Sequence, residues 1–146
     1  MITMSNNSPH GTTLSSLQEE NRKVIILIAD DEPEILEYLQ AELKANNENF
    51  SIKIACSGYK ALNYIQSNHI DLLLTDIAMP DMDGYDLYSR VREIRPNLPI
   101  IMMTGFGYDP KHSLIKAKED GLEMIFYKHF DVKKLFDMIN DSLRKK

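Results

Sequence analysis

Five short apolar segments alternate along the chain with segments of helical periodicity, and this alternation is the feature that most constrains the fold. The apolar segments are rich in branched or bulky side chains and span residues 24–29, 52–55, 72–75, 99–103 and 124–127. Continuous apolarity, in place of strict alternation, is typical of strands buried on both faces of a sheet. Only the second segment carries a charged residue, Lys53, which indicates an edge strand.

The segments between these strands repeat apolar residues at helical spacing. Residues 35–43 place isoleucine and leucine on one face, and Pro33 stands at the first helical position after an acidic cap region. Similar spacing predicts helices around residues 61–65, 87–94, 110–119 and 132–143, the last with Asp131 as its N-cap. Strand and helix therefore alternate five times.

Strands that alternate with helices form a parallel sheet with right-handed crossovers. The pattern predicts an α/β, flavodoxin-like doubly wound (βα)5 fold with a parallel five-stranded sheet of order 2-1-3-4-5. Ligands of such sheets bind beyond the carboxyl ends of the strands, at the switch point between strands 1 and 3. We therefore expect the chemistry of this chain at the residues that directly follow the apolar segments.

Composition narrows the possible functions. The chain has 17 basic and 22 acidic residues and a net charge of −5, which disfavours direct nucleic-acid binding. The single cysteine, Cys56, cannot form an internal disulfide, and this favours a reducing, cytoplasmic location. No apolar run approaches the ~20 residues of a membrane-spanning helix, and no signal peptide is expected. Residues 1–22 are polar and are expected to form a flexible tail before a folded domain of residues 23–146.

Polar side chains gather at four predicted strand ends. Asp30 and Asp31 follow the first strand, Asp76 follows the third, Thr104 follows the fourth and Lys128 the fifth. Neighbouring strands lie ~4.8 Å apart, so the three aspartates can reach one small ion. Converging carboxylates repel unless one is protonated or a cation binds, and oxygen ligands suit Mg²⁺. The lysine and the threonine suit phosphoryl oxygens, and the third-strand aspartate can attack phosphorus to give an acyl phosphate.

Each of these residues has a simpler interpretation when it is taken alone. Acidic residues before Pro33 are also what a helix N-terminus favours. Thr104 alone is typical of a strand-end cap, and Lys128 alone is typical of a solvated surface. Their joint position at four strand ends, on one side of one sheet, favours a functional site.

These motifs resemble the receiver domain of bacterial two-component response regulators. The resemblance covers about residues 23–146. It is carried by Ile28-Ala-Asp-Asp-Glu32, Asp76-Ile-Ala-Met-Pro80-Asp-Met-Asp-Gly84, Met-Met-Thr104-Gly, Ala117 with Gly121, and Lys128.

The resemblance implies a phosphorylation-dependent signalling switch. Such a domain takes a phosphoryl group from the phosphohistidine of a sensor kinase or a histidine phosphotransfer protein. It relays the signal by protein–protein contacts, through the surface of the fourth helix, fifth strand and fifth helix. It catalyses only its own phosphorylation and dephosphorylation, so it is not an enzyme in the usual sense. Met79 and Met82, in the loop after Asp76, are further candidates for a partner surface.

The resemblance also implies a role for each site residue. Asp76 is the expected phosphoacceptor, Thr104 is expected to hydrogen-bond to the phosphoryl group, and Lys128 to pair with it. The expected protein ligands of Mg²⁺ are Asp30, Asp31, Asp76 and the backbone carbonyl of Ala78.

Three features depart from the family pattern. His129 stands where the family has proline after the lysine, and a trans peptide bond is expected before it because a non-proline cis bond costs ~3–4 kcal/mol. Ile125 replaces the switch aromatic of the family, so the usual coupling to the threonine is expected to be altered or absent. Ala78 cannot orient water and Phe106 can shield the site, so slow self-dephosphorylation is expected.

Two other functions stay open. One is a phosphorylation-independent receiver-like adaptor, which Ile125 and His129 favour. The other is a phosphotransferase of the haloacid-dehalogenase type, which also uses Asp, Thr, Lys and Mg²⁺ on a parallel sheet. That family places its nucleophile in an Asp-x-Asp motif after strand 1, whereas Asp30 and Asp31 are adjacent here.

Overall fold

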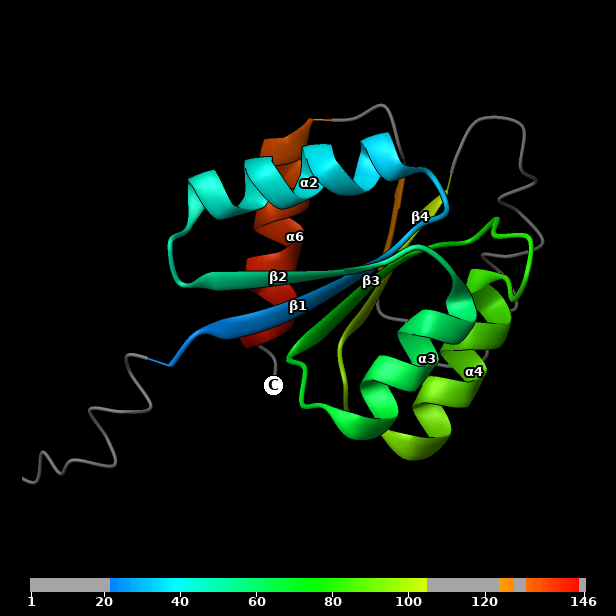
Figure 1. Cartoon of the computed structure of the whole chain (residues 1–146). Coiled ribbons are helices and arrows are strands. Elements are labelled where there is room, and N and C mark those ends of the chain that lie inside the picture. The colour runs from blue at the N-terminus through cyan, green and yellow to red at the C-terminus, as the bar shows by residue number, and fades with distance from the viewer. Residues whose placement is uncertain (1–21, 105–123, 128–130, 145–146) are drawn as a thin grey trace, which may run out of the picture.

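The structure is a computed structural model that describes residues 22–104, 124–127 and 131–144 (Figure 1). In this part of the chain, no helix is long and apolar enough to cross a bilayer. The polar segment 1–21 and the helix expected around 110–119 lie outside the described residues. The described elements are β1 (Val24–Ala29), α2 (Pro33–Asn46), β2 (Phe50–Ala55), α3 (Gly58–Ser67), β3 (Leu72–Asp76), α4 (Gly84–Ile94), β4 (Ile100–Thr104), β5 (Met124–Tyr127) and α6 (Val132–Arg144).

The strands form one sheet of order β2-β1-β3-β4-β5, and every neighbouring pair is parallel. This confirms the predicted fold and its switch point between β1 and β3. The strand that carries Lys53 lies at an edge of the sheet, as its sequence indicated, and the lysine is exposed. β2 begins at Phe50, two residues earlier than expected, because Phe50 already pairs in register with Val24 of β1. Its ring is buried, with its centroid 5.7 Å from that of Phe136 of α6.

Helices cover both faces of the sheet, with α2 and α6 on one side and α3 and α4 on the other (Figure 1). β1 supplies both cores because successive side chains of a strand point to opposite faces. Ile26 and Ile28 pack into the core under α2 and α6, whereas Leu27 and Ala29 pack into the core under α3 and α4. All four side chains are fully buried, as continuous apolarity predicted.

The helix N-termini follow the sequence signals closely. Pro33 occupies the first turn of α2, where its missing N–H costs nothing. The Ser57 hydroxyl accepts the N–H of Lys60 at the start of α3. Asp131 caps α6 as predicted, because its carboxylate accepts the N–H of Lys133 at 2.9 Å.

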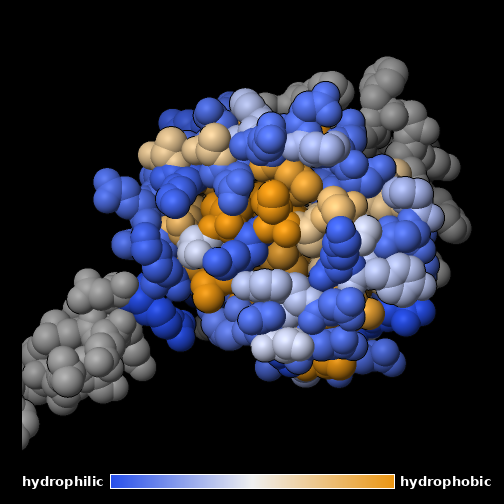
Figure 2. Space-filling model, viewed as in Figure 1, coloured by the Kyte–Doolittle hydropathy of each residue, from blue (hydrophilic) through white to orange (hydrophobic). Residues whose placement is uncertain are grey.

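The loop methionines do not form a partner surface. Met79 and Met82 are buried, at 6% and 4% exposed, in the core under α3 and α4. They are buried because the loop after β3 folds back against the start of α3. Exposed apolar surface lies at the β2 edge, between α2 and α3 (Figure 2), where Ile54 is 45% exposed.

Candidate functional site

The strand register brings two aspartates level with each other at the carboxyl end of the sheet. Ala29 of β1 pairs with Thr75 of β3, so Asp30 and Asp76 each follow a paired residue on neighbouring strands. Both carboxylates are buried, with exposed fractions of 0% and 3%. Burial at this point follows from the fold, because Asp30 directly follows the buried end of β1 and Asp76 is the last residue of the buried strand β3.

A third carboxylate joins this pair. Single carboxylate oxygens of Asp30, Glu32 and Asp76 all lie within 4.8 Å of one another. A local turn brings the glutamate back toward the site, because its N–H donates to Asp30 Oδ1 at 2.9 Å. We use the term acidic cluster for these three residues.

Glu32 was not among the expected metal ligands, although it completes the Asp-Asp-Glu motif that the sequence displays. Asp31 was expected to be a ligand, but it is exposed and lies outside the acidic cluster. Its ligand role stays a prediction. The sequence contains Glu32 in this motif, but the turn that directs it into the acidic cluster is seen only in the structure.

The donor set of the acidic cluster fits a hard divalent cation. Asp30 and Asp76 are buried and Glu32 is exposed. Close carboxylates repel each other, and a nearby cation relieves that repulsion. The three donors are all oxygens, which Mg²⁺ prefers, and a few carboxylates leave room for the waters that this ion retains. The cluster therefore matches the chemistry of a magnesium site.

At the end of the loop of residues 77–83, the backbone passes very close to the backbone at the end of β3. A Cβ atom on Gly84 would lie 2.2 Å from the carbonyl oxygen of Asp76, so only glycine fits there. The N–H of Gly84 also donates to the carbonyl of Ile77 at 2.7 Å, which closes the loop on itself. Ala78, the expected carbonyl ligand, is exposed within this closed loop. The Asp-to-Gly spacing of the motif thus reflects a packing requirement.

The loop is also attached to the start of α3. Asp81 accepts the N–H of Gly58 through Oδ1 at 3.2 Å and the N–H of Tyr59 through Oδ2 at 3.0 Å. Desolvation raises the pKa of this carboxyl, but hydrogen bonds from backbone N–H groups, that of Tyr59 foremost, outweigh it and hold the pKa below its ordinary value. Sequence reasoning missed this contact between distant segments.

For the remaining expected site residues, the structure gives at most the position of the backbone. Asp76 pairs with Met103 of β4, so Thr104 lies one residue beyond that level on the neighbouring strand. Lys128 directly follows β5, but it lies outside the described residues, as do His129 and Phe106. The roles of these residues and the trans bond before His129 stay predictions. Ile125 lies within β5, in register with Met102 of β4.

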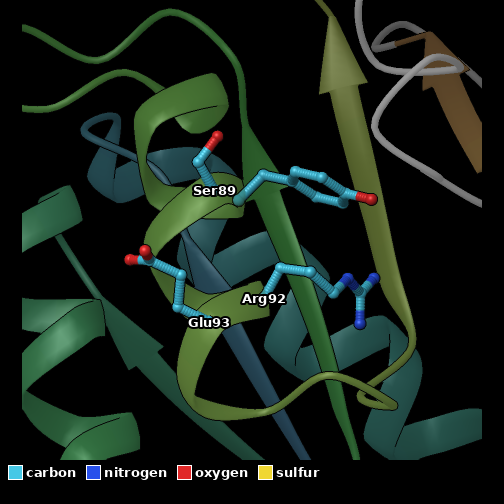
Figure 3. Close-up of a pocket in the computed structure, with 4 residues that line it drawn as sticks. Ser89, Arg92 and Glu93 are labelled. Atoms are coloured by element: carbon cyan, nitrogen blue, oxygen red, sulfur yellow. The ribbon is translucent and has the colours of Figure 1, made fainter.

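A surface hollow of about 390 Å³ lies on α4, away from the acidic cluster. Tyr88, Ser89, Arg92 and Glu93 line it (Figure 3). Arg92 is engaged in holding the turn after α4, since its guanidinium donates to the carbonyls of Pro96 and Leu98 and lies 5.0 Å from the centre of the Tyr88 ring. Among the described lining residues, Arg92 is thus engaged in structural contacts.

Comparison with known proteins agrees with the geometry. Residues 26–140 match the family model of the response regulator receiver domain. The transcriptional regulatory protein GlrR of Escherichia coli (strain K12) is 30% identical over 118 residues, which cover 81% of this chain and 26% of that protein. The sensor histidine kinase RcsC of the same strain is 39% identical over 85 residues, which cover 58% of this chain and 9% of that kinase. The chain thus spans about a quarter or less of these relatives.

Solved structures share the fold. A CheY-like response regulator receiver domain protein from Methanospirillum hungatei JF-1 has a TM-score of 0.78 and 27% identity, covering 84% of this chain and 95% of that one. A receiver domain from Clostridium thermocellum has a TM-score of 0.76 with the same identity and coverage. Proteins of this kind are signalling domains that bind Mg²⁺ at an acidic pocket and interact with histidine kinases or phosphotransfer proteins. With the fold, the acidic cluster and the family match in agreement, the chain belongs to the response regulator receiver domain family of two-component signalling.

Proposed function

We propose that Asp76 accepts a phosphoryl group from a phosphohistidine and that the modified domain passes the signal to another protein. The observation that carries this proposal is the acidic cluster, in which the buried carboxylate of Asp76 lies within 4.8 Å of two further carboxylates. Carboxylates this close repel each other unless one is protonated or a positive charge lies nearby, so the arrangement favours cation binding. Repulsion among carboxylates in such a cluster favours a functional role for the cluster over a structural one.

The proposed transfer needs no nucleophile besides this carboxylate. A carboxylate oxygen of Asp76 attacks phosphorus, and an O–P bond forms as the N–P bond of the phosphohistidine breaks. The electron pair of the broken bond returns to the imidazole nitrogen, which takes up a proton. Later attack by water on phosphorus releases inorganic phosphate and restores the carboxylate. The chain thus catalyses only its own modification and its reversal.

The acidic cluster supports Mg²⁺ as the cofactor of this transfer. The proposed protein ligands are Asp30, Asp31, Asp76 and the carbonyl of Ala78, with Glu32 beside them as a further carboxylate. When bound, the ion supplies positive charge that offsets the phosphoryl oxygens.

The signal arises from the negative charge that phosphorylation brings to the site. An aspartyl phosphate carries roughly two negative charges at neutral pH, where the free carboxylate carried one. Thr104 ends β4 and Lys128 follows the neighbouring β5, and a hydroxyl and an ammonium group are suited to contact the new anion. Loops that contact it shift the domain toward one of two arrangements. We further propose a cytoplasmic location, a sensor kinase or phosphotransfer protein as donor, and a downstream protein as receiver of the signal.

Intact-mass measurement tests the proposal directly. The purified chain is incubated with acetyl phosphate and Mg²⁺, and the wild type is expected to gain about 80 Da. Asp76→Asn is expected to gain nothing. Asp86→Asn is the matched control, because Asp86 is an exposed aspartate in the first turn of α4, and this variant is expected to gain the same mass as the wild type.

Two other results would favour the alternative functions. A wild type that gains no mass with acetyl phosphate or phosphoramidate contradicts the proposal and favours a phosphorylation-independent adaptor. Steady turnover of p-nitrophenyl phosphate favours an enzyme of the haloacid-dehalogenase type. The proposal predicts a single modification per chain without such turnover.

A further inference from the structure

The start of α3 is completed by a residue from a distant segment. The first N–H groups of a helix have no partner within the helix. Ser57 accepts only the N–H of Lys60, whereas the N–H groups of Gly58 and Tyr59 donate to the two carboxylate oxygens of Asp81. A carboxylate at this position also interacts favourably with the helix dipole. The N-terminus of α3 therefore has one cap from its own segment and a second cap from the loop that follows Asp76.

Backbone packing reinforces this contact. A Cβ atom on Gly58 would lie 2.6 Å from the carbonyl oxygen of Met82 and 2.8 Å from its Cβ, so helix and loop meet without a side chain between them. Met82 itself is buried in the core under α3 and α4. The loop next to Asp81 consequently has little freedom to move relative to α3.

Ala78 lies between two points at which the loop is fixed. On one side, the hydrogen bond from the Gly84 N–H to the Ile77 carbonyl closes the loop next to Asp76. On the other side, Asp81 holds the loop to α3 through two charge-assisted hydrogen bonds. The path of the backbone at residue 78 is therefore set by both attachments, and only the second involves a side chain that a single substitution removes.

We propose that Asp81 is a positioning residue for the metal site, which orients the Ala78 carbonyl by holding loop 77–83 against the N-terminus of α3. This inference rests on the proposed function, since it takes that carbonyl as a ligand of Mg²⁺. Asp81 acts through backbone geometry and does not touch the ion. Its negative charge is matched by the N–H groups of α3, so it adds little repulsion to the acidic cluster.

The test compares two variants that remove caps from the same helix. Asp81→Ala removes the loop contact, whereas Ser57→Ala removes the cap within the segment and leaves the loop attached. Both are expected to lower the Tm by a similar few degrees. The Mg²⁺ dissociation constant is measured without a phosphodonor, by following backbone amide NMR shifts of residues 76–84 during titration with MgCl₂.

Only the loop variant is expected to affect the metal site. Asp81→Ala raises the Mg²⁺ dissociation constant about tenfold, the lower end of what loss of an outer partner of a metal ligand costs. Ser57→Ala leaves this constant within about twofold of the wild type. Asp81→Asn retains an acceptor oxygen and restores most of the affinity. Should Asp81→Ala fail to fold, Asp81→Ser, whose hydroxyl accepts one of the two hydrogen bonds, replaces it with the same expected direction.

The outcomes separate this inference from the proposed function. A wild type that binds Mg²⁺ alongside an Asp81→Ala variant of unchanged affinity overturns the positioning role alone. Equal losses of affinity in Asp81→Ala and Ser57→Ala also overturn it, because general weakening of α3 then explains the result. A wild type that binds no Mg²⁺ overturns the cofactor of the proposed function and this inference with it.

Discussion

Buried carboxylates stand at both ends of the sheet, in opposite surroundings. At the amino end, Asp71 precedes β3 and is 6% exposed. Its Oδ2 accepts the N–H of Ile25 at 2.8 Å, while Oδ1 lies 2.9 Å from His69 Nε2 and 3.8 Å from Arg22. At the carboxyl end, Asp76 completes β3 and is gathered with two other carboxylates.

The difference teaches how to separate structural from functional acids. Donors surround Asp71, and its hydrogen bond joins the start of β3 to β1, so its burial serves the fold. The acidic cluster brings like charges within 4.8 Å of one another, an arrangement that favours cation binding. Burial alone does not distinguish the two cases, whereas the chemistry of the neighbours does.

The largest expected effect on stability is at the amino end. Asp71→Ala deprives the Ile25 N–H of its acceptor, and the free energy of unfolding is expected to fall by about 2–3 kcal/mol. Urea denaturation measures this change. Asp71→Asn, which retains an acceptor oxygen, is expected to lose less than half as much, and equal losses in the two variants would contradict the assigned role of the hydrogen bond.

The next largest effect on stability is expected from cation binding at the carboxyl end of the sheet. At Mg²⁺ concentrations ten times the dissociation constant, the free energy of unfolding of the wild type is expected to rise by about 1.4 kcal/mol. Asp76→Asn is expected to lose most of this gain, and Asp71→Asn to retain it. Thermal unfolding with and without MgCl₂ measures the gain. A similar response of both variants would show that the two ends do not differ as described.

A smaller effect of opposite sign is expected from neutralising the acidic cluster. Without divalent cations, Asp76→Asn removes one of three close carboxylates, and the free energy of unfolding is expected to rise by about 1 kcal/mol. Urea denaturation in EDTA measures this rise. A loss of stability would indicate that the cluster is structural, like Asp71.

The smallest effect concerns Asp81 and pH. Because its folded pKa lies below the ordinary value of 3.8, its ionised form contributes stability that is fully present above that value. The stability difference between wild type and Asp81→Asn is therefore expected to stay constant from pH 7 to about pH 4 and to shrink as pH falls through the lowered pKa. Urea midpoints across this range measure it, and a difference that shrinks above pH 5 would contradict the assignment.

Local patterns were sufficient for much of the fold. Continuous apolarity predicted buried strands, and the charge of Lys53 marked the edge strand correctly. Asp131 was recognised as a cap because a cap and its helix are adjacent in sequence. The expectation that polar residues meet at the carboxyl ends of the strands was correct for Asp30 and Asp76. The register of β1 and β3 puts these two residues at the same level of the sheet.

Contacts between distant segments could not be predicted in this way. Met79 and Met82 were only candidates for a partner surface, and the loop that folds against α3 buries them. Glu32 enters the acidic cluster through a turn whose direction the sequence does not specify. Asp81 caps a helix more than twenty residues away in sequence.

The sequence by itself determined the order of strands and helices, the layout of the sheet and the strand ends at which acidic residues meet. These features follow from periodicity and strand order, which are short-range or topological. The tertiary structure alone decided which carboxylate joins Asp30 and Asp76, and how the loop after β3 is held. Those outcomes depend on the direction of the backbone in turns and on the fit between helix and loop. At that contact the two backbones lie too close for any residue but glycine, and the Asp81 carboxylate accepts hydrogen bonds from a segment distant in sequence.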